Sequence, residues 1–221
     1  MCRFKSGIIF KTRCVVAPVE NDSHSYLLRE LNVDDTYINA SRMFVRAELV
    51  PENDEWWTDP DGWKFVVDQD VTPDWFDLDP GKYEEEFRQA VKAWWDEHVI
   101  VDEKIDELSS GFYRLKRCEV KKLLNDVKVY LDSSTVGKTY DSSTVGEMWD
   151  SSTVGEMYNS STVGEMYNSS TVGEMYDSST VGEMYNSSTA RDFKNYPNIK
   201  IHIPKGGKFE LVEHEEGKTC D

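Results

Sequence analysis

The stretch DSSTVGEMYNSSTVGEMY, residues 150–167, holds two consecutive copies of one nine-residue unit. Six full copies follow one another without gaps, and a partial seventh copy begins at Asn186. The full copies begin at Asp132, Asp141, Asp150, Asn159, Asn168 and Asp177. Self-similarity at a fixed period is the signature of a stacked architecture, in which each unit buries a face against the next.

A period of nine is too short for helical repeats and suits β-structure. Each copy contains a turn, (Asp/Asn)-Ser-Ser, followed by a strand, Thr-Val-Gly-Glu-Met-Tyr. Nine residues span only about 30 Å, so a coil made from one copy would enclose almost no interior. We therefore expect a β-solenoid with two copies per coil and about 4.8 Å between coils.

The glutamates decide which side chains point inward. Strict alternation would place Glu beside Val and Tyr, and a stack of glutamates is too costly to bury. Either Thr, Gly and Met point inward, or the strand bends at its glycine so that Val and Met both do; we favour the bend. The glutamates are then exposed, in one row or in two parallel rows: Glu147, Glu156, Glu165, Glu174 and Glu183. The aromatic residues are expected to form ladders near the corners: Tyr140, Trp149, Tyr158, Tyr167, Tyr176 and Tyr185.

Nine-residue repeats with glycine and aspartate also occur in calcium-binding β-rolls, which use paired glycines and an invariant carboxylate. Here the glycine pair is missing, and the turn residue alternates between Asp and Asn. This exchange favours turn geometry over metal ligation, because both side chains tolerate left-handed backbone. We expect no metal and no cofactor.

The rest of the chain frames the repeat. Residues 1–118 are expected to form a small α+β head domain, residues 119–193 the solenoid, and residues 194–221 a C-terminal cap and tail. Within 117–131 we expect degenerate first coils, and a capping hairpin over 199–203 and 209–212.

The head domain combines both kinds of periodicity. Strands are expected over 4–10, 14–17, 43–50 and 63–67, the first two as a hairpin. A helix capped by Asp22 or Ser23 covers 25–31, an amphipathic helix covers 82–99, and a short one covers 103–108.

The charge limits the partners. The chain has 42 acidic and 25 basic residues, a formal net charge of −17. Such a charge repels nucleic acid and anionic membranes, and it suits basic proteins or simply solubility. No stretch approaches the length of a membrane span, and four widely spread cysteines favour a reducing cytoplasm.

Several residues are weak candidates for chemistry. Cys2 would become an N-terminal nucleophile if Met1 were removed, which is the minority, enzymatic interpretation. The histidines His24, His98, His202 and His214 show no ligand spacing. Asp68 and Asp70, with Asp74 and Asp77 nearby, are interpreted as a solvated acidic loop rather than a cation site. Trp56 and Trp57 are candidates for a partner-binding surface.

The segments MCRFKSGII, FVRAEL and VDQDVTPDW, followed by short repeats, resemble a group of uncharacterised proteins of bacteriophages and gut bacteria. The resemblance implies a phage or mobile-element setting and brings no catalytic residues with it. A phage-encoded chain of this kind would act in the host cytoplasm.

These observations predict a non-enzymatic binding or assembly protein that presents glutamate and tyrosine ladders on a solenoid. The expected partner is a protein, such as a basic host protein, and the tyrosine ladder is a candidate for self-association. One alternative is a phage anti-defence inhibitor that mimics nucleic acid. The other is an enzyme that uses Cys2.

Overall fold

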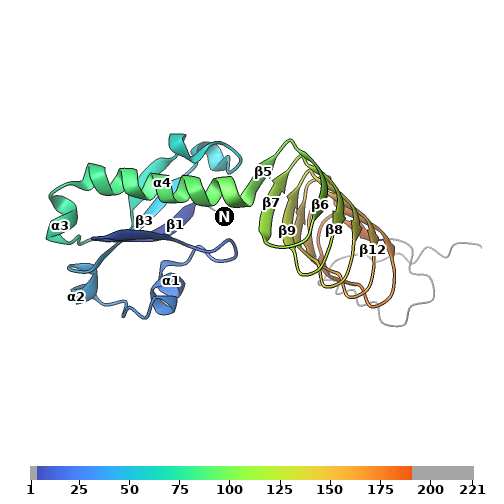
Figure 1. The fold of residues 1–221 in the computed structure, drawn as a ribbon, viewed down its shortest axis with the longest axis horizontal. Coiled ribbons are helices and arrows are strands. Elements are labelled where there is room, and N and C mark those ends of the chain that lie inside the picture. Colours follow the sequence, from blue (N-terminus) through green and yellow to red (C-terminus); the bar gives the residue numbers. More distant parts are fainter. Residues whose placement is uncertain (1–3, 191–221) are drawn as a thin grey trace, which may run out of the picture. The chain divides into compact units, whose positions relative to one another are not determined.

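The computed structural model describes residues 4–190, in two compact units whose boundary lies between His98 and Val99 (Figure 1). The first unit mixes helices with an antiparallel sheet, and the described part of the second is built from parallel strands. The predicted α+β region followed by a β-solenoid is therefore confirmed. Cys2 and the predicted cap over 194–221 lie outside the described residues.

The first unit is built on a four-stranded sheet with the strand order β2-β1-β3-β4. Its strands are β1 (Lys5–Phe10), β2 (Arg13–Val16), β3 (Phe44–Val50) and β4 (Lys64–Val67). The first two form the predicted hairpin, and the other two match the strands expected over 43–50 and 63–67.

Helices cover both faces of this sheet. They are α1 (His24–Glu30), α2 (Tyr37–Ala40), α3 (Asp74–Asp77) and α4 (Pro80–His98), with 3-10 turns η1 (Glu52–Asp54) and η2 (Pro60–Gly62). The long helix α4 lies along one face, and α1 and α2 lie on the other (Figure 1). Ser23 caps α1 by accepting a hydrogen bond from the backbone N–H of Tyr26. A Cβ on Gly7 would lie 2.5 Å from the Phe87 ring, so glycine lets α4 approach β1 closely.

Within the described residues, twelve strands of the solenoid form two six-stranded parallel sheets. The odd sheet contains β5 (Val99–Val101), β7 (Phe112–Lys116), β9 (Lys128–Asp132), β11 (Thr144–Trp149), β13 (Thr162–Met166) and β15 (Thr180–Met184). The even sheet contains β6 (Lys104–Leu108), β8 (Glu119–Leu123), β10 (Thr135–Thr139), β12 (Thr153–Met157), β14 (Thr171–Met175) and β16 (Thr189–Ala190). Consecutive strands alternate between the sheets, which confirms two copies of the repeat per coil.

The short helix expected over 103–108 is wrong, because this segment is strand β6. Its apolar residues, Ile105 and Leu108, are three positions apart, and that spacing is typical of a helix. They face the solenoid core in the same way as Val136 and Thr139 of β10, with which they share a column through β8.

The solenoid consequently begins at Val99, earlier than the boundary of 118/119 expected from the sequence. Residues 99–116 supply β5, β6 and β7, and they extend the sheets that the repeat continues. Strand β6 shares with the nine-residue unit the spacing of its core-facing apolar residues but not the Thr-Val-Gly-Glu-Met sequence, so self-similarity did not reveal these coils. The degenerate coils expected over 117–131 are present as β8 and most of β9.

In each repeat, Val and Met point into the solenoid although three positions separate them. Val154 and Met157 are both fully buried. In a regular strand, residues three apart lie on opposite faces. The strand therefore bends at Gly155, and the partner strand bends at the same position: Val154 pairs with Val172, the next pair is Glu156 with Glu174, and the register does not shift. The favoured bend at the glycine is confirmed.

Glycine is required at this bend because neighbouring coils approach closely there. A Cβ on Gly164 would lie 2.5 Å from the carbonyl oxygen of Gly146, and one on Gly173 would lie 2.4 Å from that of Gly155. Real Cβ atoms do not come so near an oxygen. The stack of glycines is thus a line of close backbone contact.

From the second unit onward, the first residue of each unit adopts a left-handed conformation, with φ near +57° at Asp141 and +58° at Asn159; in the first unit Ser133 takes this conformation. Asp and Asn tolerate this region better than other non-glycine residues. The exchange of Asp for Asn along the repeat therefore follows from backbone geometry, as the sequence indicated.

Candidate functional site

The repeated glutamates form two parallel rows, one on each sheet of the solenoid. On the odd sheet, Glu165 lies in register between Glu147 and Glu183. On the even sheet, Glu156 pairs with Glu174 on one side and with Lys138 on the other. The sequence predicts that all five glutamates are exposed, but only Glu174 is; the other four are half-buried, each hydrogen-bonded to the aromatic side chain of its own unit. The structure therefore supports the arrangement in two rows.

The aromatic residues stack into two ladders, as expected. Tyr140, Tyr158 and Tyr176 follow one another at ring-centroid distances of 5.1 and 4.8 Å. The second ladder runs through Trp149, Tyr167 and Tyr185 at 4.1 and 4.9 Å, with nearly parallel rings. Each ladder lies at or just after the strand ends.

Every ring of the ladders except Tyr140, whose unit has Lys138 in place of the glutamate, donates a hydrogen bond to the glutamate of its own unit. The Trp149 Nε1–H donates to the Glu147 carboxylate at 2.8 Å, and the Tyr167 hydroxyl donates to Glu165. The equivalent pairs are Tyr158 with Glu156, Tyr176 with Glu174 and Tyr185 with Glu183. Burial and the Glu165 carboxylate raise the pKa of Tyr167 well above its usual range. The tyrosines therefore stay protonated and act as fixed donors.

The two rows differ in charge compensation. Lys138 makes an ion pair of 2.8 Å with Glu156, and this contact, together with Tyr158, lowers the pKa of the Glu156 carboxyl. Across residues 4–190, the row Glu147, Glu165 and Glu183 has no ion pair. We call these three residues the uncompensated row.

The two tryptophans proposed for a binding surface occupy different environments. Trp56 is only 5% exposed, and its ring meets Trp63 and Trp94 edge to face at 5.4 and 5.7 Å. Its place is therefore the interior of the head and not a surface, because α4 brings Trp94 over it. Trp57 is half-buried.

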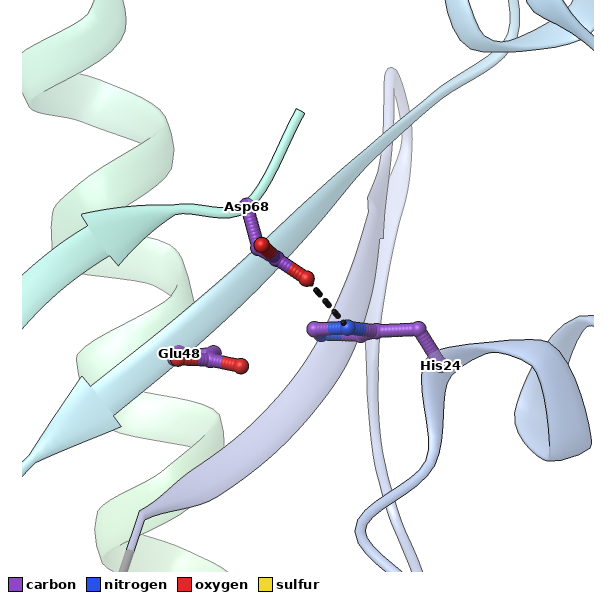
Figure 2. A group of neighbouring side chains, drawn as sticks. All are labelled: His24, Glu48 and Asp68. Atoms are coloured by element: carbon purple, nitrogen blue, oxygen red, sulfur yellow. Dashed lines mark ion pairs between the residues drawn. The ribbon is translucent and has the colours of Figure 1, made fainter. Parts of the chain in front are cut away.

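A second group of polar residues gathers in the head domain. His24 opens α1, Glu48 lies in the middle of β3, and Asp68 directly follows β4. Their side chains point toward one another, with the Asp68 carboxylate 3.2 Å from the His24 Nδ1 (Figure 2). Sequence spacing could not reveal this group, because each residue comes from a different element.

The other acidic residues of this loop do not join the cluster. Asp77 accepts a hydrogen bond from the Thr72 hydroxyl at 2.6 Å, and Asp70 and Asp74 are exposed. Asp68 and Asp70 both line a pocket of about 600 Å³, together with Arg46 and Gln69, but only Asp68 also reaches His24. The acidic loop is therefore split between a solvated part and one residue that faces His24.

Neither described cysteine is activated as a nucleophile. Burial and the nearby Glu86 carboxylate raise the pKa of the Cys14 thiol to about 11. Burial also raises the pKa of Cys118, whose thiol donates to the carbonyl of Ile100. A raised pKa removes the thiolate that nucleophilic chemistry needs near neutral pH.

Comparisons with models of protein families, with curated proteins and with solved structures found no match for this chain. Within residues 4–190, no helix is long and apolar enough to cross a membrane. The chain can thus be described by its own geometry: a mixed helix-and-sheet unit followed by a β-solenoid that carries ordered glutamate and aromatic rows.

Proposed function

We propose that the protein is a non-enzymatic binding or assembly protein, and that the uncompensated row binds a basic protein. The observation that carries the proposal is the alignment of Glu147, Glu165 and Glu183 in strand register without an ion pair in the described chain. Three carboxylates in such a line repel one another, and cationic side chains from a partner would relieve that repulsion.

The aromatic ladder supports the same proposal because it fixes the carboxylates before a partner arrives. Trp149, Tyr167 and Tyr185 each donate to the neighbouring glutamate. Side chains that are already ordered lose less entropy on binding. The net charge of −17 adds long-range attraction for a basic protein.

The resemblance to phage and gut-bacterial proteins favours a phage or mobile-element setting, and hence the cytoplasm of a host cell. In that setting the row could serve as a nucleic-acid mimic, which is a second candidate function. The observation that favours mimicry is the regular line of negative charge, one carboxylate per coil at about 4.8 Å. Duplex DNA carries one charge per about 3.4 Å of each strand, so the spacing is similar but wider.

The test is affinity purification from a bacterial lysate with the full chain and two variants. The row variant E147Q/E165Q/E183Q removes three charges and keeps the side-chain shapes. The control variant E20Q/E55Q/E103Q removes three charges from exposed positions outside the row. We expect the wild type and the control to capture the same basic protein, the row variant to lose it, and capture to weaken steeply with salt.

Equal capture by both variants would contradict the proposal. If added duplex DNA competes for the captured protein, mimicry is favoured over simple docking. Self-association through the tyrosine ladder is measured separately by light scattering, and a monomer at every practical concentration would exclude it.

A further inference from the structure

The His24 ring has a fixed orientation deep in the head domain. The side chain is only 8% exposed, and its Nε2 lies 3.2 Å from the backbone carbonyl oxygen of Ala47. A carbonyl only accepts hydrogen bonds, so Nε2 carries a proton. In a neutral imidazole the other nitrogen, Nδ1, then has a lone pair and acts as an acceptor.

This lone pair points at two carboxylates. The Nδ1 lies 3.2 Å from the Asp68 Oδ2, and one ligand atom from each of His24, Glu48 and Asp68 lies within 4.8 Å of the others (Figure 2). Two acceptors cannot face each other at 3.2 Å without a proton or a cation between them. A proton on Nδ1 would put a positive charge on a ring that is only 8% exposed, and a cation bound between the two acceptors is the alternative.

The carboxylates of the cluster also lack a positive partner. Within residues 4–190 the Glu48 side chain makes no hydrogen bond or ion pair, although it is half-buried on β3. The nearby cations are committed elsewhere, since Lys5 pairs with Asp22 at 2.8 Å and Arg46 pairs with Asp35. A neutral His24 ring beside two ionised carboxylates therefore leaves two negative charges that no nearby side chain balances.

We propose that His24 Nδ1, Glu48 and Asp68 bind one divalent transition-metal ion. One imidazole with two carboxylates, and no sulfur, suits Zn²⁺ or Mn²⁺. The Nε2–H bond to Ala47 is the outer contact that metal-binding histidines make to fix their tautomer. This site is independent of the solenoid rows.

The geometry allows the ion to enter with little movement. Metal–ligand bonds of about 2.0 to 2.2 Å require the ligand atoms to lie within roughly 4.4 Å of one another. Asp68 is 59% exposed and lines the pocket of about 600 Å³, so its carboxylate can rotate inward and solvent can reach the ion. His24 and Glu48 stay in place on α1 and β3.

The experiment measures Zn²⁺ by calorimetry and Mn²⁺ by electron paramagnetic resonance on the full chain. The variants are E48Q and D68N, with D74N as the matched control, because Asp74 is exposed and lies outside both the cluster and the pocket lining. We expect the wild type and D74N to bind one ion more than E48Q, or to bind it at least tenfold more tightly, and D68N to lose affinity similarly.

Other histidines and the cysteines can also bind Zn²⁺, so only the difference between wild type and variant counts. Identical binding by wild type, E48Q and D68N would overturn the proposal. A ¹⁵N NMR spectrum of the histidine ring nitrogens is a second test, and it uses the wild-type protein alone. Zn²⁺ should shift Nδ1 of His24 while Nε2 keeps its proton, whereas two protonated nitrogens in saturating Zn²⁺ would show a plain ion pair with Asp68.

The row variant E147Q/E165Q/E183Q should bind the ion like the wild type. Its result therefore separates failure of this site from failure of the proposed partner binding.

Discussion

Strands β9 and β11 are neighbours in the same sheet, yet they reach the same interior in two ways. In β9, Val129 and Leu131 are two positions apart and alternate regularly into the core. In β11, Val145 and Met148 are three apart, and the glycine between them is the extra residue. The register shift between the two strands marks the change.

The outer surfaces differ more than the interiors. The first coils of the odd sheet carry Arg114 and Lys128, both packed on the Tyr130 ring. The repeat carries carboxylates held by aromatic donors in the corresponding column. The interior side chains therefore keep the same fold in both regions, while the outer side chains of one column change from a cation, Arg114, to an anion, Glu147, within two coils.

The largest expected effect tests the shared interior. Met166→Ala and Leu131→Ala each remove a buried side chain, one from the repeat and one from a first coil. Both should lower the free energy of unfolding by about 2 to 5 kcal/mol in chemical denaturation. Met184→Ala, at a half-buried position in β15, should cost less. A loss confined to one of the two regions would show that their interiors are not equivalent.

The next effect tests the glycine bend that separates the two strand types. Gly164→Ala places a Cβ 2.5 Å from the Gly146 oxygen and should destabilise the protein by about 2 to 4 kcal/mol. Gly81→Ala is the control, because nothing lies within 4 Å of its Cβ. It should leave stability unchanged or raise it by up to about 1 kcal/mol. Similar melting curves for the two variants would contradict the close approach.

A smaller effect tests the turns of the repeat. Asn159 lies between Asp141 and Asp177 along one edge, linked to both by side-chain-to-backbone hydrogen bonds. Asn159→Asp keeps the turn geometry but aligns three carboxylates, so it should cost about 1 kcal/mol at pH 7. The cost should vanish below about pH 4, where carboxylates protonate. Asn186→Asp, whose neighbour is Asn168, should cost little at either pH.

The smallest effect tests the compensated row. Lys138→Met removes the main cause of the lowered pKa of Glu156, so that pKa should rise in a carbon NMR titration. Because the folded pKa is below the unfolded value, this stabilisation is present above about pH 4.3 and disappears as the pH falls through the folded pKa. It amounts to less than about 1 kcal/mol for such a surface pair. Lys104→Met, which breaks a pair with Glu119, should leave Glu156 unchanged.

The structure of the repeat could be predicted in detail because every copy places valine, glycine and an outward polar residue in the same order. A stack of glutamates excludes one orientation of the strand, and the glycine permits the other. Strands β5, β6 and β7 could not be predicted as part of the solenoid, because the spacing of Ile105 and Leu108 in β6 fits a helix as well as a strand. The burial of Trp56 and the convergence of His24 with Asp68 depend on contacts between distant segments, which leave no mark in local spacing.

The positions of Asp and Asn in the turns constrain how the array can gain or lose copies. Each copy stacks on the copy two units away, so alternate copies lie on opposite edges of the solenoid. Deleting one unit therefore moves every later copy from its own edge to the other. Removing 150–158 leaves no aspartate beside another at the turns, whereas removing 159–167 would bring Asp150 against Asp177. Deletions of different copies by replication slippage therefore differ in their electrostatic cost, although the copies are nearly identical in sequence.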